Sequence, residues 1–159
     1  AAHLKLAELE QAGKLKAVIT QNIDGLHQAA GSKEVLELHG SVLRNHCTRC
    51  GRFYGLDDIL KMKGVPKCGC GGVIKPDVVL YEEGLDNEVI ERSIAHIRKA
   101  DMLIIGGTSL VVYPAAGLID YYHGNKLVLI NKSATSRDGQ ADLVISDSIG
   151  KVLGDAVGV

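Results

Sequence analysis

The sequence has little net charge, few aromatic residues and few prolines. Its 18 basic and 19 acidic residues leave a net charge of −1, which gives no general reason to expect nucleic acid or an acidic membrane as a partner. The local basic run of Arg44, Arg49 and Arg52 is better explained as a solvated face. Three prolines and six aromatic residues stand against 19 glycines, and this balance fits a turn-rich α/β protein better than a disordered one. With 46% apolar residues in 159, the chain can form one core with a small appended module.

Long hydrophobic runs are also missing. The most apolar region, residues 102–118, contains a Gly-Gly-Thr-Ser turn and a proline, so a buried strand and loop are favoured over a membrane span. Charged residues interrupt every apolar run near the N-terminus, and we see no signal peptide there. We therefore expect a soluble, cytoplasmic protein without a membrane partner.

The four cysteines form two close pairs, Cys47 with Cys50 and Cys68 with Cys70. A secreted domain could use four cysteines for two disulfides, but disulfides would not require this clustering. Two pairs separated by 17 residues are typical of a zinc ribbon, in which four thiolates form a closed structural site. The alternative is four unligated buried thiols. His46 could be imagined as a ligand, but we expect it to be an exposed flank.

Apolar periodicity predicts a wound α/β protein with an inserted module between Gly40 and Pro76. Helices and strands alternate at a spacing that argues for a parallel sheet covered on both faces. The chain opens directly in a helix, which suggests that the sheet is incomplete at its start. The expected helices are 3–13, 24–30, 56–62, 86–99, 114–123 and 148–157, the last with Asp147 or Ser148 as N-cap, and the expected strands are 16–20, 35–38, 100–105, 126–130 and 143–145.

Polar residues gather where two short apolar segments end. Asn22 and Asp24 follow the first segment, and His39 follows the second. In open α/β sheets, ligands bind beyond the carboxyl ends of the strands. Histidine suits a general base because its pKa lies near neutrality, although His39 could also be an ordinary surface histidine. Asp24 could equally form an Asx turn before Gly25.

Two further strand ends carry small or polar residues, at 106–109 and at 131–133. Small residues let a phosphate or ribose approach the backbone. Each loop alone is explained equally well by a tight turn. Taken together along one edge of a sheet, they favour a bound nucleotide.

These motifs, in this order, resemble the sirtuin family. The resemblance covers essentially the whole chain and rests on Thr20-Gln21-Asn22-Ile23-Asp24-Gly25-Leu26-His27, His39-Gly40, the two cysteine pairs, residues 75–83 (KPDVVLYEE), Gly107-Thr108-Ser109-Leu110 with Pro114-Ala115-Ala116, and Asn131-Lys132.

The resemblance implies an NAD-dependent protein lysine deacylase with a Rossmann-like domain, residues 1–41 and 78–159, and an inserted zinc-ribbon module, residues 42–77. The implied catalytic residues are His39, Asn22 and Asp24, and the implied zinc ligands are Cys47, Cys50, Cys68 and Cys70. NAD would be bound by Gln21, Asn22, Ile23, Asp24, Gly107, Thr108, Ser109, Asn131, Lys132, Ser133 and Ile149. An acyl-lysine peptide would lie as an added strand against Val78, Val79, Tyr81, Glu83, Val111 and Tyr113.

In the family's reaction, the acyl oxygen attacks the ribose carbon as nicotinamide leaves. His39 would then activate a ribose hydroxyl, and the products would be free lysine, nicotinamide and O-acyl-ADP-ribose. Two other functions remain open. One is mono-ADP-ribosyl transfer, and the other is a non-catalytic zinc-ribbon module that binds a protein or nucleic acid.

The sequence departs from the family pattern in three places. The second cysteine pair has one intervening residue instead of two, and Tyr81-Glu82-Glu83 stands where many members have Phe-Gly-Glu. No counterpart is present for the family's opening strand and glycine-rich cofactor loop, which would precede Ala1. We therefore expect the 159-residue chain alone to bind NAD poorly and to show no turnover.

Overall fold

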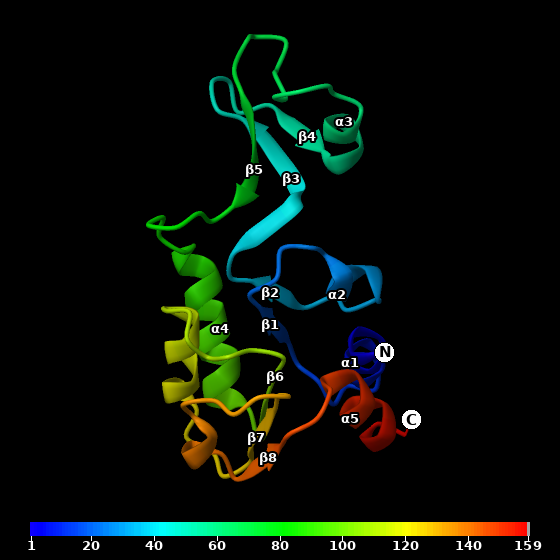
Figure 1. Ribbon diagram of the computed structural model, residues 1–159, viewed down its shortest axis with the longest axis vertical. Helices are drawn as coiled ribbons and strands as arrows, with labels where there is room; N and C mark the ends of the chain where they lie inside the picture. The colour runs from blue at the N-terminus through cyan, green and yellow to red at the C-terminus, as the bar shows by residue number, and fades with distance from the viewer. Residues whose placement is uncertain (159) are drawn as a thin grey trace.

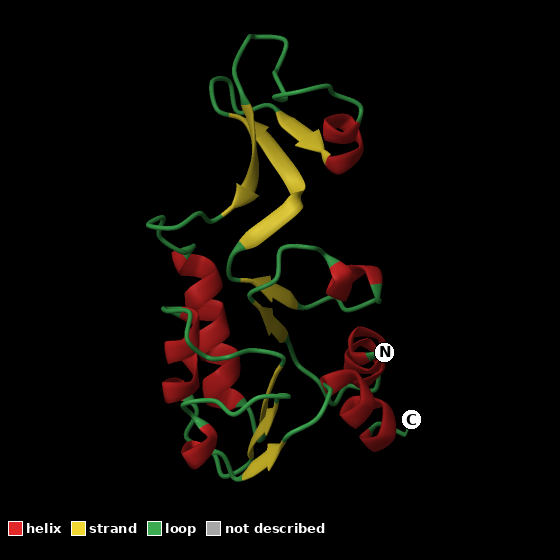
Figure 2. Ribbon diagram, in the orientation of Figure 1, coloured by secondary structure: helices red, strands yellow, loops and turns green. Residues whose placement is uncertain are grey.

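The structure, a computed structural model, describes residues 1–158 and consists of three small β-sheets flanked by helices (Figures 1 and 2). The elements in chain order are α1 (Ala2–Gln11), β1 (Val18–Thr20), α2 (Leu26–Ala29), β2 (Val35–Glu37), β3 (Gly40–Cys47), β4 (Phe53–Gly55), α3 (Leu56–Leu60), β5 (Ile74–Val78), α4 (Asn87–Lys99), β6 (Leu103–Gly106), the 3₁₀ helix η1 (Ala115–Tyr121), β7 (Leu127–Ile130), the 3₁₀ helix η2 (Asp138–Gln140), β8 (Leu143–Ile145) and α5 (Ile149–Ala156).

Two of the sheets are parallel, which confirms the predicted α/β class. Strand β1 pairs with β2, and a separate sheet has the order β6-β7-β8. We call β1, β2, α4 and β6–β8 the parallel region. The predicted helical cover is incomplete, because Ile104 in β6 is 38% exposed and Val144 in β8 is 40% exposed. Strand β6 is therefore not the fully buried strand that its apolar sequence predicted.

Helix α4 forms as its sequence predicted. The Asp86 carboxylate accepts hydrogen bonds from the backbone N–H groups of Glu88 and Val89 and so caps two N–H groups that have no partner within the helix. Basic residues occupy its last turn, where they complement the helix dipole. Its apolar face packs on Leu38 of the β2 end and on Leu118 of η1, around the buried Ile97.

Helix η1 differs from expectation, whereas α5 has its predicted N-cap. Residues 115–121 form a 3₁₀ helix instead of the expected α-helix, and Gly117 in its middle lowers α-helical propensity. Ser148 is the N-cap of α5 but makes no side-chain capping bond. Asp147 instead accepts a hydrogen bond from the Ser148 N–H at 2.7 Å.

The third sheet is antiparallel, with the order β4-β3-β5. Together with α3 it lies at one end of the molecule, far from the two termini (Figure 1). We call residues 40–78 the antiparallel region. Its small core consists of the buried Cys47, Cys68 and Ile74, with partly buried Tyr54, Ile59 and Met62 packed against them. The chain enters it through Gly40, whose φ of +75° is a left-handed conformation that glycine adopts without strain.

Within residues 1–158, none of the helices is long and apolar enough to cross a membrane.

Candidate active site and metal centre

The four cysteine thiols converge on one point in the antiparallel region. Their sulfur atoms all lie within 4.8 Å of one another, with 3.5 Å between the Sγ atoms of Cys47 and Cys70 and 3.6 Å between those of Cys50 and Cys68. Four sulfurs bound tetrahedrally to zinc at about 2.3 Å would lie about 3.8 Å apart. The cluster therefore fits a closed zinc site made of thiolates.

Nearby donors lower the pKa of two of the four thiols, those of Cys68 and Cys47. The backbone N–H of Cys70 and then the Tyr54 hydroxyl lower the pKa of Cys68 to about 6. The backbone N–H of Cys50 lowers the pKa of Cys47. Zinc binds cysteine as the thiolate, so these two shifts favour metal binding. At Cys70 the Gly72 N–H lowers the pKa, but hydrogen bonds with the Cys47 and Cys68 thiols outweigh it and raise the pKa.

His46 lies beside the metal centre and does not belong to the four-sulfur cluster. Its side chain is 42% exposed, in keeping with the predicted exposed flank, but it is not free. Its Nδ1 lies 2.7 Å from Oδ1 of Asp77, and its ring packs edge-to-face on Phe53 with 5.4 Å between the centroids.

The β1 and β2 ends bring the predicted base and amide together. His39 Nδ1 lies 2.9 Å from the backbone oxygen of Gln21, next to Asn22. A carbonyl oxygen can only accept, so Nδ1 carries the proton and Nε2 is left with a free lone pair. This is the tautomer that a general base requires. Asn22 is exposed, and its own N–H donates to Thr20 Oγ1 at 3.1 Å.

Asp24 forms an Asx turn before Gly25, which the sequence allowed as an alternative to a role in the site. Its Oδ1 accepts the N–H of Leu26 at 3.0 Å, and Gly25 follows with a φ of +71°. The carboxylate remains exposed, and Ile23 between Asn22 and Asp24 is partly buried. Asp24 can therefore shape the turn and still face a ligand.

A side-chain bond joins the β1 loop to the end of β6. Thr108 donates its hydroxyl to Oε1 of Gln21 at 3.1 Å, which brings the two predicted halves of the nucleotide site together. Gly107, the residue before Thr108, has a φ of +65°, and an added Cβ there would meet nothing within 4 Å. Space at a strand-end glycine suits a close approach of a phosphate or ribose.

The remaining cofactor candidates lie around the ends of β6 and β7. Ser109 and Lys132 are exposed, while Asn131 turns its Nδ2 back to the Ser133 oxygen at 2.8 Å. Ile149 opens α5 and packs so tightly on Gly106 that an added Cβ there would lie 2.1 Å from Ile149 Cδ1.

The predicted peptide-binding residues lie on two exposed segments. Val78 ends β5, and the N–H of Val79 donates to the His39 oxygen at 3.1 Å. Tyr81 is 100% exposed, and Glu83 accepts the Leu80 N–H. A cavity of about 270 Å³ is lined by Val78, Val79 and Glu83 among other residues. On the second segment, Val111 and Tyr113 are 65% and 64% exposed.

Two contacts near the site were not predicted. Burial lowers the pKa of His27, and the neighbouring His3 lowers it further, with their rings 4.5 Å apart. Arg44, read from the sequence as part of a solvated face, binds Glu37 at 2.8 Å. The one available signal was an acidic residue, Glu37, inside an otherwise apolar strand.

Comparison with known proteins identifies the family. The Sir2 family model matches residues 1–114. The chain belongs to the Sir2 family. A Clostridium perfringens protein named NAD-dependent protein deacetylase is 69% identical over 158 residues, covering 98% of this chain and 65% of that protein. A Clostridium acetobutylicum protein of the same name is 66% identical, covering 96% of this chain and 63% of its own length. The chain thus spans about two thirds of the length of these relatives.

Solved Sir2 structures share the fold of this Sir2-family chain. Sir2 in complex with the inhibitor EX-527, 2'-O-acetyl-ADP-ribose and deacetylated p53 peptide superimposes with a TM-score of 0.91 at 42% identity, over 98% of this chain and 69% of that one. A complex of Sir2 with p53 peptide and NAD+ gives 0.90 at 41% identity, over 98% and 67%. The Rossmann-like fold that the resemblance implied is confirmed.

Proposed function

We propose that the protein carrying this chain removes acetyl groups from protein lysines in an NAD-dependent reaction. The supporting comparisons are relatives named NAD-dependent protein deacetylase and Sir2 structures with acetylated peptide, NAD+ and 2'-O-acetyl-ADP-ribose. The observation that carries the proposal is the bond from His39 Nδ1 to the Gln21 oxygen, because it leaves Nε2 of the neutral ring with a lone pair that can act as a base.

His39 is the general base in this proposal, and Asn22 and Asp24 line the same pocket. NAD would supply an electrophilic ribose carbon. Acyl-lysine, NAD and one water molecule would then give free lysine, nicotinamide and O-acyl-ADP-ribose. Nε2 of His39 takes the proton of the attacking hydroxyl, and the Gln21 carbonyl stabilises the resulting imidazolium through Nδ1–H. Such a positioned base contributes on the order of 10² to 10⁴ in rate.

The remaining binding roles are assigned by position. Gln21 and Ile23 join Asn22 and Asp24 at the nicotinamide and its ribose. The adenosine half is held by Gly107, Thr108, Ser109, Asn131, Lys132 and Ser133, with Ile149 against the adenine. The acyl-lysine peptide lies between the two exposed segments, residues 78–83 and 111–113. The exposure of Tyr81, Val111 and Tyr113 supports this placement.

We also propose that residues 42–77 form one inserted zinc module within a domain made of residues 1–41 and 78–159. The antiparallel pairing of residues 40–78 supports this division. Cysteines kept as metal ligands suit a reducing compartment, which supports a cytoplasmic location. A net charge of −1 supports the absence of direct nucleic-acid binding.

The products of the reaction separate the candidate functions. The natural protein is incubated with NAD and an acetyl-lysine peptide, and the peptide and nucleotides are identified by mass spectrometry. We expect nicotinamide, O-acetyl-ADP-ribose and a peptide that has lost one acetyl group. A protein target that gains ADP-ribose would instead support mono-ADP-ribosyl transfer, and no consumption of NAD would support a non-catalytic zinc-ribbon module.

A further inference from the structure

Strand β3 contains a bulge between the metal centre and the active-site histidine. Its ladder with β5 pairs Gly40 with Val78 and Ser41 with Asp77, and then resumes with Asn45 opposite Pro76. Residues 42–44 are left without partners in β5. Beta-bulges occur preferentially beside active sites, where they redirect side chains.

Each of the three bulge residues contacts the part of the chain that leads to the proposed active site. The Val42 N–H donates to the Ile23 oxygen at 3.0 Å. Leu43 packs on Gly25, where an added Cβ would lie 2.5 Å from Leu43 Cδ1. Arg44 reaches Glu37 at the end of β2, with 2.8 Å between Nη1 and Oε2. The bulge is therefore the contact surface between the antiparallel region and the β1–β2 loops.

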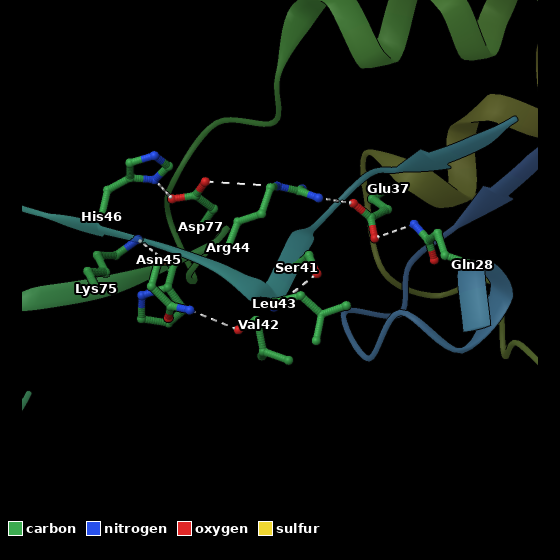
Figure 3. Close-up of polar contacts among 11 residues, drawn as sticks. Gln28, Glu37, Ser41, Val42, Leu43, Arg44, Asn45, His46, Lys75 and Asp77 are labelled. Atoms are coloured by element: carbon green, nitrogen blue, oxygen red, sulfur yellow. Dashed lines mark hydrogen bonds and ion pairs between the residues drawn. The ribbon is translucent and has the colours of Figure 1, made fainter. Parts of the chain in front are cut away.

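The charged side chains at the bulge form one connected network (Figure 3). Glu37 accepts from Arg44 and also from Gln28 Nε2 at 2.8 Å. The other edge of the Arg44 guanidinium, Nε, lies 3.9 Å from Asp77 Oδ2, and Asp77 binds His46 through its second oxygen. The Glu37 side chain is only 9% exposed, so its carboxylate depends on these donors more than a surface carboxylate would.

The network joins the segment that carries His39 to the segment that leads into the proposed acyl-lysine site. Glu37 lies two residues before His39, and Asp77 lies two residues before Val79, whose N–H binds the His39 oxygen at 3.1 Å. The backbones are in direct contact, since an added Cβ on Gly40 would lie 1.8 Å from the Asp77 oxygen. Arg44 therefore connects the end of β2 to β5 at the stretch where the ladder between β3 and β5 is interrupted.

We propose that Arg44 is a positioning residue. Its ion pair with Glu37 and its contact with Asp77 hold residues 37–40 and 77–79 in the register that places a bound acyl-lysine against His39. The inference rests on the proposed deacylase function for its kinetic consequence, but the register itself can be measured without turnover.

Two variants of the natural protein and one matched control test this role. Arg44→Met removes the positive charge and keeps the aliphatic stem. Glu37→Gln removes the negative charge of its partner, which lies in β2 and outside the antiparallel sheet. The control is Arg92→Met, because Arg92 pairs with Glu34 and is 50% exposed, close to the 46% of Arg44. Zinc content is measured for each variant. If Arg44→Met loses zinc, Glu37→Gln carries the test.

Amide hydrogen exchange is the first measurement. We expect Val79 to lose protection in both network variants and to keep it in Arg92→Met. We expect kcat/KM for an acetyl-lysine peptide to fall by about tenfold in Arg44→Met, since small displacements at a reacting centre are costly. KM for NAD should stay unchanged, and Arg44→Lys should recover part of the loss.

The outcomes distinguish the two proposals. Unchanged protection of Val79 in both network variants overturns the positioning role, whatever the kinetics show. Lost protection with an unchanged kcat/KM overturns it as well, because the register would then not matter to the reaction. A wild-type protein without any turnover contradicts the proposed function, and hydrogen exchange alone then decides whether Arg44 sets the register.

Discussion

The antiparallel and parallel regions are built around different kinds of side chain. Two of the three buried core residues in the antiparallel region are cysteines, Cys47 and Cys68. The corresponding cluster of the parallel region joins Ile97 of α4 to Leu38, which follows β2, and to Leu118 of η1, with eight more partly buried apolar residues packed against it. The first region is therefore expected to depend on a metal, and the second on buried apolar area. The proposed active site lies where the two regions meet.

Removing zinc is expected to have the largest effect and to act on one region only. Metal binding contributes on the order of 10 kcal/mol to the folding of small zinc domains, and the antiparallel region has little other core. After chelation we expect amide protection to disappear across residues 44–74 and to persist in α4 and β7. Equal amide protection of the antiparallel region with and without zinc would contradict its expected dependence on a metal.

A core substitution should produce the opposite pattern. Leu129 in β7 is 2% exposed, and a cavity at such a site costs about 2–5 kcal/mol. Leu129→Ala should therefore lower the denaturant midpoint of the parallel region while zinc content stays the same. Leu60→Ala, at a site that is 71% exposed, is the control and should change stability by less than about 0.5 kcal/mol. Loss of zinc in Leu129→Ala would show that the two regions do not fold independently.

The junction between the regions should be sensitive to a single methyl group. Gly40→Ala places a Cβ 1.8 Å from the Asp77 oxygen, whereas Gly51→Ala, with a similar φ of +71°, meets nothing within 4 Å. The left-handed backbone alone costs about 1–2 kcal/mol, so Gly51→Ala measures that term by itself. Gly40→Ala should lower the free energy of unfolding by more than Gly51→Ala does, and it should also expose the Val79 amide to hydrogen exchange. Equal stabilities of the two variants would argue against a tight junction.

A polar contact on the surface, between α1 and the residues that precede β2, should have the smallest effect on stability. The Glu10 carboxylate accepts the N–H groups of Lys33 and Glu34, each at 2.8 Å, and the Glu34 and Lys33 bonds lower the Glu10 pKa from 4.5. A lowered folded-state pKa stabilises the protein above pH 4.5, and this contribution is lost as the pH falls through the folded-state value. Glu10→Gln should therefore be slightly less stable than wild type at pH 7 and equally stable in strong acid. Chemical denaturation at several pH values measures the difference, and a gap that widens toward low pH would contradict this assignment.

Much of the fold could be predicted from local sequence. The cysteine pairs predicted their own cluster, because four thiols at this spacing are typical of a zinc ribbon. Helix α4 was predicted by the helical spacing of its apolar residues. The bulge at residues 42–44 could not be predicted, because register depends on backbone contacts such as the one between Gly40 and Asp77. For the same reason Arg44 was assigned to solvent, since its partners Glu37 and Asp77 become neighbours only after the chain has folded.

The candidate site was predicted in part. His39, Asn22 and Gln21 follow two strand ends, and the structure brings these strand ends together. The orientation of the imidazole could not be predicted, because it depends on one bond to the Gln21 carbonyl. The exposure of Ile104 in β6 was also not predicted, because an apolar strand is predicted to be buried whether or not a helix covers it.

The most direct test of His39 as the general base is the rate at which His39→Ala forms O-acetyl-ADP-ribose in the natural protein, with NAD and an acetyl-lysine peptide. We expect kcat/KM to fall by about 10² to 10⁴, while zinc content and protection of the Val79 amide stay at their wild-type values. O-acetyl-ADP-ribose formed by His39→Ala at the wild-type rate would contradict the assignment of His39 as the general base.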